Sequence, residues 1–134
     1  MKTLSISLFV LATILLSACS GEAQKPTTVT ANATMQVIQF HNEHRCVTCL
    51  KIEELTKKTL ADYFPAIPFS LVNVEDKKNE KMTEQFEAFG TSLFLYNPKT
   101  GKKKDLTDFA FMNAGDEKKF ESELKQQIEA FLKS

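Results

Sequence analysis

Two cysteines three residues apart, Cys46 and Cys49, carry the most evident chemistry of this sequence. An apolar run typical of a buried strand precedes them, and an amphipathic segment typical of a helix follows them. The first turn of a helix offers unpaired backbone N–H groups and the positive end of the helix dipole, and both favour a thiolate over a thiol. We therefore predict a redox-active pair. Cys46, at the solvent-facing start of the helix, is the expected nucleophile. Cys49, one helical turn further in, is the expected resolving cysteine.

The same cysteines admit two other interpretations. A structural bridge would close a very short loop and remove little entropy from the unfolded chain, so it would stabilise the fold only weakly. A metal or metalloid site has a more concrete basis, because two imidazoles and two thiolates stand within nine residues. These ligands suit zinc, copper(I) or arsenite. The four residues are His41, His44, Cys46 and Cys49.

The N-terminal residues predict export and lipid attachment. The apolar stretch at residues 4–16 is too short for a comfortable membrane span and is typical of the core of a signal peptide. It runs into Leu-Ser-Ala-Cys, which resembles a bacterial lipobox. We therefore expect a lipoprotein signal peptide over residues 1–18 and acylation of Cys19. Of the three cysteines, the remaining two would then pair with each other.

The polar residues that follow predict how the domain is held. Residues 19–34, rich in Thr and Ala, are expected to form a flexible tether between the lipid and a single domain over residues 35–134. This organisation predicts a membrane-anchored protein on the periplasmic or extracytoplasmic side. Ser20, directly after the lipidated cysteine, is compatible with the outer membrane of a diderm host.

Composition restricts the partners. The chain has 17 basic and 17 acidic residues, and this balance gives no reason to expect a nucleic acid. It has no NAD or flavin signature, so we expect no cofactor beyond the redox-active disulfide itself. The expected partners are protein disulfides or dithiols, with a membrane electron donor to recycle the pair.

The pattern of apolar residues predicts the order of the elements. Buried strands and a short edge strand are expected at residues 35–41, 69–74, 92–96 and 102–106. Helices are expected at residues 46–63, from Asn79 to a stop at Gly90, and from an N-cap at Asp116 onward, with 107–115 ambiguous. Met82, Phe86 and Phe89 recur at helical spacing and are expected in the core. The lysines at 102–104 are expected to guard the edge strand, with contact to an anionic membrane as the alternative.

Strands that alternate with helices imply parallel βαβ units, and the tight turn at residues 97–101 adds an antiparallel pair. The expected fold is α/β and thioredoxin-like, with a four-stranded mixed sheet and helices on both faces. From about Val37 to Leu132 the chain resembles the small thioredoxin-like proteins of the ArsF family, labelled as nitrophenyl compound nitroreductase subunits. The shared features are Phe-His-x-x-x-Arg-Cys-x-x-Cys, Asn73-Val74, Ser92-Leu93 and Gly115-Asp116. The resemblance implies a dithiol site at Cys46 and Cys49, and it allows a non-catalytic subunit of a larger reductase as another role.

The chain departs from ordinary thioredoxins in the residues around the cysteines. Arg45 stands where a Trp usually precedes the pair, and its fixed charge should lower the pKa of Cys46. Thr91 takes the place of the cis-proline that faces the cysteines, or Ser92 does so if the register shifts by one. We expect a trans peptide there, because a cis bond at a non-proline residue costs about 3 kcal/mol, and we expect these two residues to meet the substrate.

The buried acid of many thioredoxins has no counterpart here. Its position falls near Phe40, so that proton acceptor is expected to be missing. His41, Glu43 or His44 could substitute for it, since all three lie between the strand and the cysteines.

Overall fold

The computed structural model describes residues 35–134. The predicted signal peptide, the lipidated Cys19 and the tether therefore lie outside the described residues. Within them the elements follow one another as β1 (Gln36–His41), α1 (Val47–Tyr63), β2 (Phe69–Asn73), the 3-10 turn η1 (Lys77–Asn79), α2 (Glu80–Phe86), β3 (Ser92–Tyr96), β4 (Lys103–Asp105), α3 (Thr107–Asn113) and α4 (Glu117–Leu132). No helix in this part of the chain is both long enough and apolar enough to cross a membrane.

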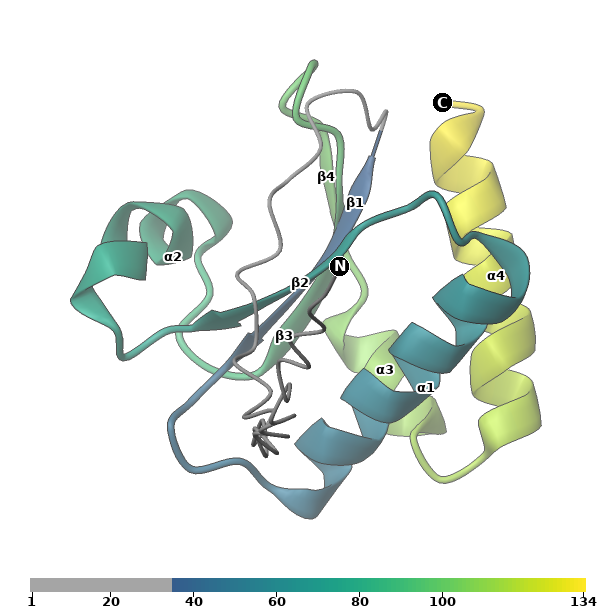
Figure 1. The fold of residues 1–134 in the computed structure, drawn as a ribbon, viewed down its shortest axis with the longest axis horizontal. Coiled ribbons are helices and arrows are strands. Elements are labelled where there is room, and N and C mark those ends of the chain that lie inside the picture. The colour runs from purple at the N-terminus through teal and green to yellow at the C-terminus, as the bar shows by residue number, and fades with distance from the viewer. Residues whose placement is uncertain (1–34) are drawn as a thin grey trace, which may run out of the picture.

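The four strands form one mixed sheet in the order β2-β1-β3-β4 (Figure 1). β1 pairs in parallel with β2 and antiparallel with β3, which in turn pairs antiparallel with β4. The first pairing is the parallel βαβ unit expected from a helix between two strands, and the last is the expected hairpin. The predicted α/β, thioredoxin-like fold is therefore confirmed.

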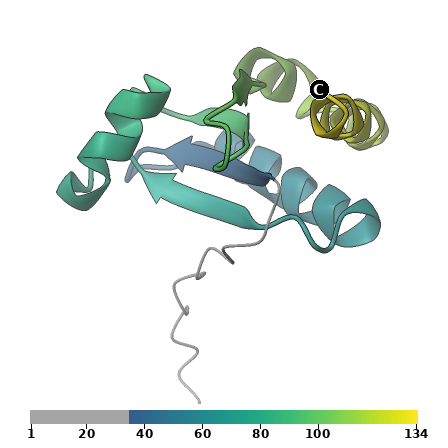
Figure 2. The ribbon, with the colours of Figure 1, turned by 90° about the horizontal axis from the view of Figure 1, so that it is seen from above.

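Helices cover both faces of the sheet, as predicted, but unequally. In Figure 1 and Figure 2, α2 stands on one side of the sheet, while α1, α3 and α4 gather on the other. Alternate residues of β1 serve the two layers: Val37 packs with α1, α3 and α4, and Phe40 packs with α2. On the α2 side, the rings of Phe40, Phe86 and Phe94 contact one another edge-on or tilted. The two inner strands, β1 and β3, are thus buried between these two layers of helices.

The second helix ends earlier than predicted. α2 stops at Phe86 because Glu87 adopts a left-handed backbone conformation, with φ at 55°, and its N–H bonds to carbonyls of the last turn. Phe89 is 88% exposed, so its assignment to the core was wrong. Asn79 occupies the N-cap position of α2 but makes no capping hydrogen bond with its side chain.

The C-terminal part of the domain follows the predicted order with one addition. Asp116 caps α4 as expected, since its side chain accepts a hydrogen bond from the N–H of Lys119 at 3.0 Å. The ambiguous residues 107–115 contain a short helix, α3, which packs against β3 and α4. α3 therefore fills the corner between the hairpin and the last helix.

Candidate redox site

Cys46 and Cys49 are joined by a disulfide at the end of β1 where α1 begins. Cys46 is the N-cap of α1, and its Sγ accepts a hydrogen bond from the N–H of Cys49 at 3.1 Å. Cys46 is exposed, whereas Cys49 is only 5% exposed. An attacking partner therefore meets the first sulfur, and the second lies beneath it. Backbone N–H groups at a helix start stabilise a thiolate at the first position.

Thr91 faces the buried sulfur from the loop before β3. Its hydroxyl donates a hydrogen bond to Cys49 Sγ at 3.3 Å. Ser92 lies within the sheet, where its backbone is paired with Phe40, and its hydroxyl donates to the carbonyl of Gly90 instead. Every peptide bond among residues 35–134 is trans. Of the two residues proposed to face the cysteines, Thr91 is thus the one that contacts a sulfur.

The buried polar residue beneath the cysteines is Gln39, which sequence reasoning missed. Its side chain is fully buried, and its Nε2 donates a hydrogen bond to the carbonyl oxygen of Cys49 at 2.9 Å. Its Oε1 is also buried and has no hydrogen-bond partner. Phe40 points into the aromatic cluster on the opposite face of the sheet. The position that corresponds to the buried acid of thioredoxins is therefore Gln39, one residue before Phe40. A glutamine within an apolar strand was the signal in the sequence.

Arg45 forms an ion pair with Glu53, two turns into α1. Burial tends to raise the pKa of Glu53, but hydrogen bonds from Lys57 and Arg45 outweigh it and hold that pKa below its usual value. Two guanidinium nitrogens of Arg45, Nε and Nη2, are buried without a partner. Much of the Arg45 charge is therefore compensated by Glu53. Any lowering of the Cys46 pKa by Arg45 is then weaker than an unpaired guanidinium would give.

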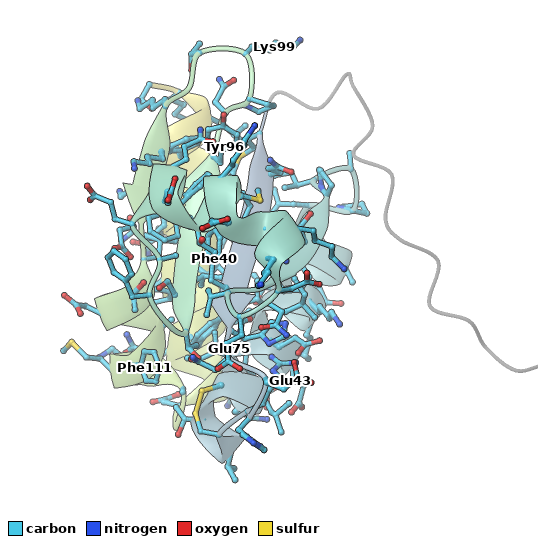
Figure 3. The ribbon with its side chains drawn as sticks, turned by 90° about the vertical axis from the view of Figure 1, so that its left-hand side faces the viewer. Phe40, Glu43, Glu75, Tyr96, Lys99 and Phe111 are labelled. Carbon is cyan, nitrogen blue, oxygen red and sulfur yellow. A yellow bond between two sulfur atoms is a disulfide. The ribbon has the colours of Figure 1, made fainter. Side chains whose placement is uncertain are left out.

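The loop before Cys46 is held against the end of β2. Asn42 donates to Glu75 at 3.2 Å, and Asn73 donates to Glu43. Two loops that are far apart in the sequence are thus joined next to the disulfide. In the view of Figure 3, the disulfide lies below Glu75 and between Glu43 and Phe111.

The two histidines do not join the cysteines in a ligand set. His41 Nδ1 lies 2.8 Å from the carbonyl oxygen of Asn42, and His44 is exposed. Within residues 35–134, no group of three or more His, Cys, Asp and Glu side chains is placed to hold a metal ion. The disulfide form therefore does not assemble the four-ligand arrangement of His41, His44, Cys46 and Cys49.

An apolar surface adjoins the exposed sulfur. Val47 is 84% exposed, and Phe111 of α3 is 42% exposed. A shallow pocket of about 310 Å³ lies beside Cys46 and is lined by Val47, Thr48, Lys51, Phe111, Ala114 and Gly115. The sequence did not reveal this surface, because half of the lining residues come from residues 107–115, whose structure the sequence left ambiguous. We call Val47 and Phe111, the exposed apolar residues that line this pocket, the apolar rim.

No protein-family description matches this chain, and no curated protein matches it. A solved structure described as that of a malarial protein is 22% identical, over 60% of this chain and 96% of its own, with a TM-score of 0.42. A likeness at this score indicates nothing about what the chain does. The functional argument therefore depends on the geometry around Cys46 and Cys49, which is compatible with a redox role.

Proposed function

We propose that this protein is a thiol–disulfide oxidoreductase that uses the Cys-Val-Thr-Cys pair. The observation that carries the proposal is the arrangement of the sulfurs. Cys46 is exposed at the N-cap of α1, and Cys49 is bonded to it from below and receives a hydrogen bond from Thr91. A structural staple does not need one accessible sulfur and one buried sulfur at a helix start. Disulfide exchange needs both.

The exchange proceeds in two balanced steps. The Cys46 thiolate attacks one sulfur of a partner disulfide, so an S–S bond forms between the proteins and the partner's other sulfur leaves as a thiolate. Cys49 then loses its proton and attacks Cys46 Sγ, which forms the intramolecular disulfide and releases the second partner thiolate. Two electrons pass to the partner, whose thiolates take up protons from water. Oxidation of a partner dithiol uses the same atoms in reverse.

The cellular setting is part of the same proposal. A lipid on Cys19 would hold the domain at the extracytoplasmic face of a membrane, within reach of protein disulfides and of a membrane electron donor that regenerates the dithiol. The resemblance to the ArsF family, carried by residues from Phe40 to Cys49, supports the same use of the cysteines.

The test is to trap partners through Cys46. With Cys49→Ser the second step is blocked, so partners should accumulate as mixed disulfides that a reductant releases. The matched control is Cys46→Ser, which keeps the buried thiol but lacks the exposed one and should trap nothing. Equal trapping by both variants, or none by Cys49→Ser, would remove the exchange mechanism.

A measurement of bound metal distinguishes the proposed oxidoreductase from a metal-binding protein that uses the same cysteines. The full protein, purified without a tag, is analysed for bound metal and titrated against a thiol redox buffer. A reversible two-electron transition without stoichiometric metal is the expected result. Stoichiometric zinc or copper without a reversible disulfide would instead establish a metal-binding lipoprotein.

A further inference from the structure

The hairpin at residues 97–104 concentrates positive charge in a way that the redox chemistry does not use. Four of its eight residues are lysines, and none is acidic. All four lysines are exposed. We call this segment the lysine hairpin, and its lysines are Lys99, Lys102, Lys103 and Lys104.

The lysine hairpin lies at the end of the sheet opposite the disulfide. Gln36, the first residue of β1, is paired with Tyr96, which is paired with Lys103. The disulfide follows the other end of β1, a strand of six residues. At about 3.3 Å per residue, the two ends of that strand are roughly 17 Å apart. In Figure 3, Lys99 accordingly marks the upper end of the domain and the disulfide the lower end.

The same end is where the preceding chain joins the domain. Met35 comes directly before Gln36, so residues 1–34, with their apolar stretch at 4–16, join the domain beside the lysine hairpin. A membrane attachment through that segment would be joined to this end of the sheet rather than to the sulfur end, so the lysine hairpin lies beside the point of attachment.

The lysine hairpin has no carboxylate partner in the part of the chain that the structure describes. Among residues 35–134, none of its four lysines forms an ion pair. Of the other lysines there, five form one (Lys51, Lys57, Lys58, Lys78 and Lys119) and five, dispersed along the chain, do not (Lys77, Lys81, Lys118, Lys125 and Lys133). The ammonium groups of two of the hairpin lysines lie against the domain, since Lys102 Nζ is over the ring of Phe131 and Lys103 Nζ is over that of Phe86. The hairpin thus presents positive charge, and two of its lysines are held against aromatic rings of the domain.

The expected role of these lysines, which is to prevent edge-to-edge pairing of β4 with another strand, explains only some of the four. β4 comprises Lys103–Asp105, so Lys99 and Lys102 lie outside it, in the turn. At the opposite end of the domain, Glu43 and Glu75 lie beside the disulfide, and the neighbouring cations Arg45 and Lys51 are paired with Glu53 and Glu54. Lysines without carboxylate partners thus gather where the N-terminal segment joins the domain, whereas carboxylates accompany the cations beside the sulfurs.

We propose that the lysine hairpin contacts the anionic phospholipid headgroups of the membrane and turns the Cys46–Cys49 pair away from the bilayer. This inference rests on the membrane attachment in the proposed function. Each lysine near an anionic surface contributes roughly a fivefold change in partitioning, and the contribution falls within a Debye length. Contact at one end would keep the exposed sulfur in the aqueous phase, where partner proteins reach it.

The test measures which lysines the membrane covers. The full chain is reconstituted on vesicles of phosphatidylcholine alone, and on vesicles that also contain phosphatidylglycerol. An amine-reactive reagent then labels the lysines, and mass spectrometry reads the extent at each one. Labelling of Lys99 and Lys104 should fall several-fold on the anionic vesicles and recover when salt is added. Labelling of Lys77 and Lys118, exposed lysines near the sulfur end, should not change.

Two double variants test whether the charge of the lysine hairpin causes this protection from labelling. Lys99→Gln with Lys104→Gln should reduce the protection of Lys102 on anionic vesicles, while Lys77→Gln with Lys118→Gln, which removes the same charge, should leave it intact. Equal labelling on the two lipid compositions, or equal loss of protection in the two variants, overturns the proposal. A redox titration of the same samples is independent of the labelling, so failure of the membrane contact and failure of the dithiol chemistry can be told apart.

Discussion

Gln39 and Cys49 are linked by a hydrogen bond between β1 and the first turn of α1. Gln39 Nε2 donates to the carbonyl oxygen of Cys49 at 2.9 Å, and its Oε1 is buried without a partner. The residue beneath the cysteines is therefore an amide, which does not titrate. The proton that leaves Cys49 during resolution has to reach water or another group, because no carboxylate occupies this position.

A carboxylate at this position should make the fold sensitive to pH. In Gln39→Glu, burial raises the pKa of the new carboxyl above its value in the unfolded chain. The folded state then holds the proton more tightly, so the variant should lose stability as the pH rises above about 4, by roughly 2 kcal/mol or more near neutrality. Urea unfolding of the variant and the wild type across this range measures the difference. The control is Gln39→Leu, whose difference from the wild type should not vary with pH. A pH-independent Gln39→Glu would contradict the burial argument.

The hydroxyl of Thr91 should accelerate the resolving step. It donates to Cys49 Sγ at 3.3 Å, and a donor at this position stabilises a thiolate when the pair is reduced. Thr91→Val keeps the shape but removes the donor, so release of the partner from the mixed disulfide should slow about three- to tenfold at neutral pH. Stopped-flow measurement of that step gives the rate. Thr91→Ser, which retains the hydroxyl, should stay near the wild-type rate, and an equal loss in both variants would indicate a packing effect.

Glu53 should make the domain sensitive to acid. Its pKa is lowered because hydrogen bonds from Lys57 and Arg45 outweigh the effect of burial, so its contribution to stability is present above its unfolded pKa and lost as the pH falls through the folded one. Glu53→Gln should lose about 1 kcal/mol near pH 7, and this deficit should shrink at about pH 3. Denaturant unfolding at the two pH values tests it. A deficit that is equal at both would show that the charge of Glu53 does not matter.

The same variant reports on Arg45. Without the Glu53 carboxylate, more of the guanidinium charge acts on the neighbouring Cys46, so the pKa of the Cys46 thiol should fall in the reduced protein. The ultraviolet absorbance of the thiolate, followed against pH, measures this pKa. Arg45→Met should move it in the opposite direction. An unchanged value in both variants would show that Arg45 does not reach the sulfur.

The features that the sequence predicted are those encoded by local patterns. The apolar run at residues 35–41 and the amphipathic run after Cys46 correctly predicted β1 and α1, because each shows the period of its element. Asp116 was recognisable as a cap because its side chain acts on a residue only three positions away. The contact of Thr91 with Cys49 followed from the fold, since the loop before β3 meets the start of α1 in this topology.

The features that could not be predicted from the sequence depend on shifts of one or a few residues along an element, or on which partner a long side chain contacts. Aligning the buried position with Phe40 rather than Gln39 is an error of one residue, and in a strand one residue changes the face of the sheet. The helix pattern through Phe89 continued past the true end, because Glu87 adopts a left-handed conformation that is more usual for glycine. Arg45 stands next to Cys46 in the sequence, but its long side chain reaches Glu53.

The apolar rim should matter for protein partners and not for small disulfides. Phe111 lies in the pocket beside Cys46 and is 42% exposed, so a partner that docks against the sulfur would bury it. Phe111→Ser should lower kcat/KM about tenfold for a protein disulfide, mainly through KM, and leave the rate with a small disulfide unchanged. Leu132→Ser is the matched control, since Leu132 is 47% exposed and lies at the far end of α4, away from the disulfide. Steady-state kinetics with both substrates separate the two effects. If Phe111→Ser slows both substrates alike, the residue supports the geometry of the disulfide; if it slows neither, partners dock elsewhere.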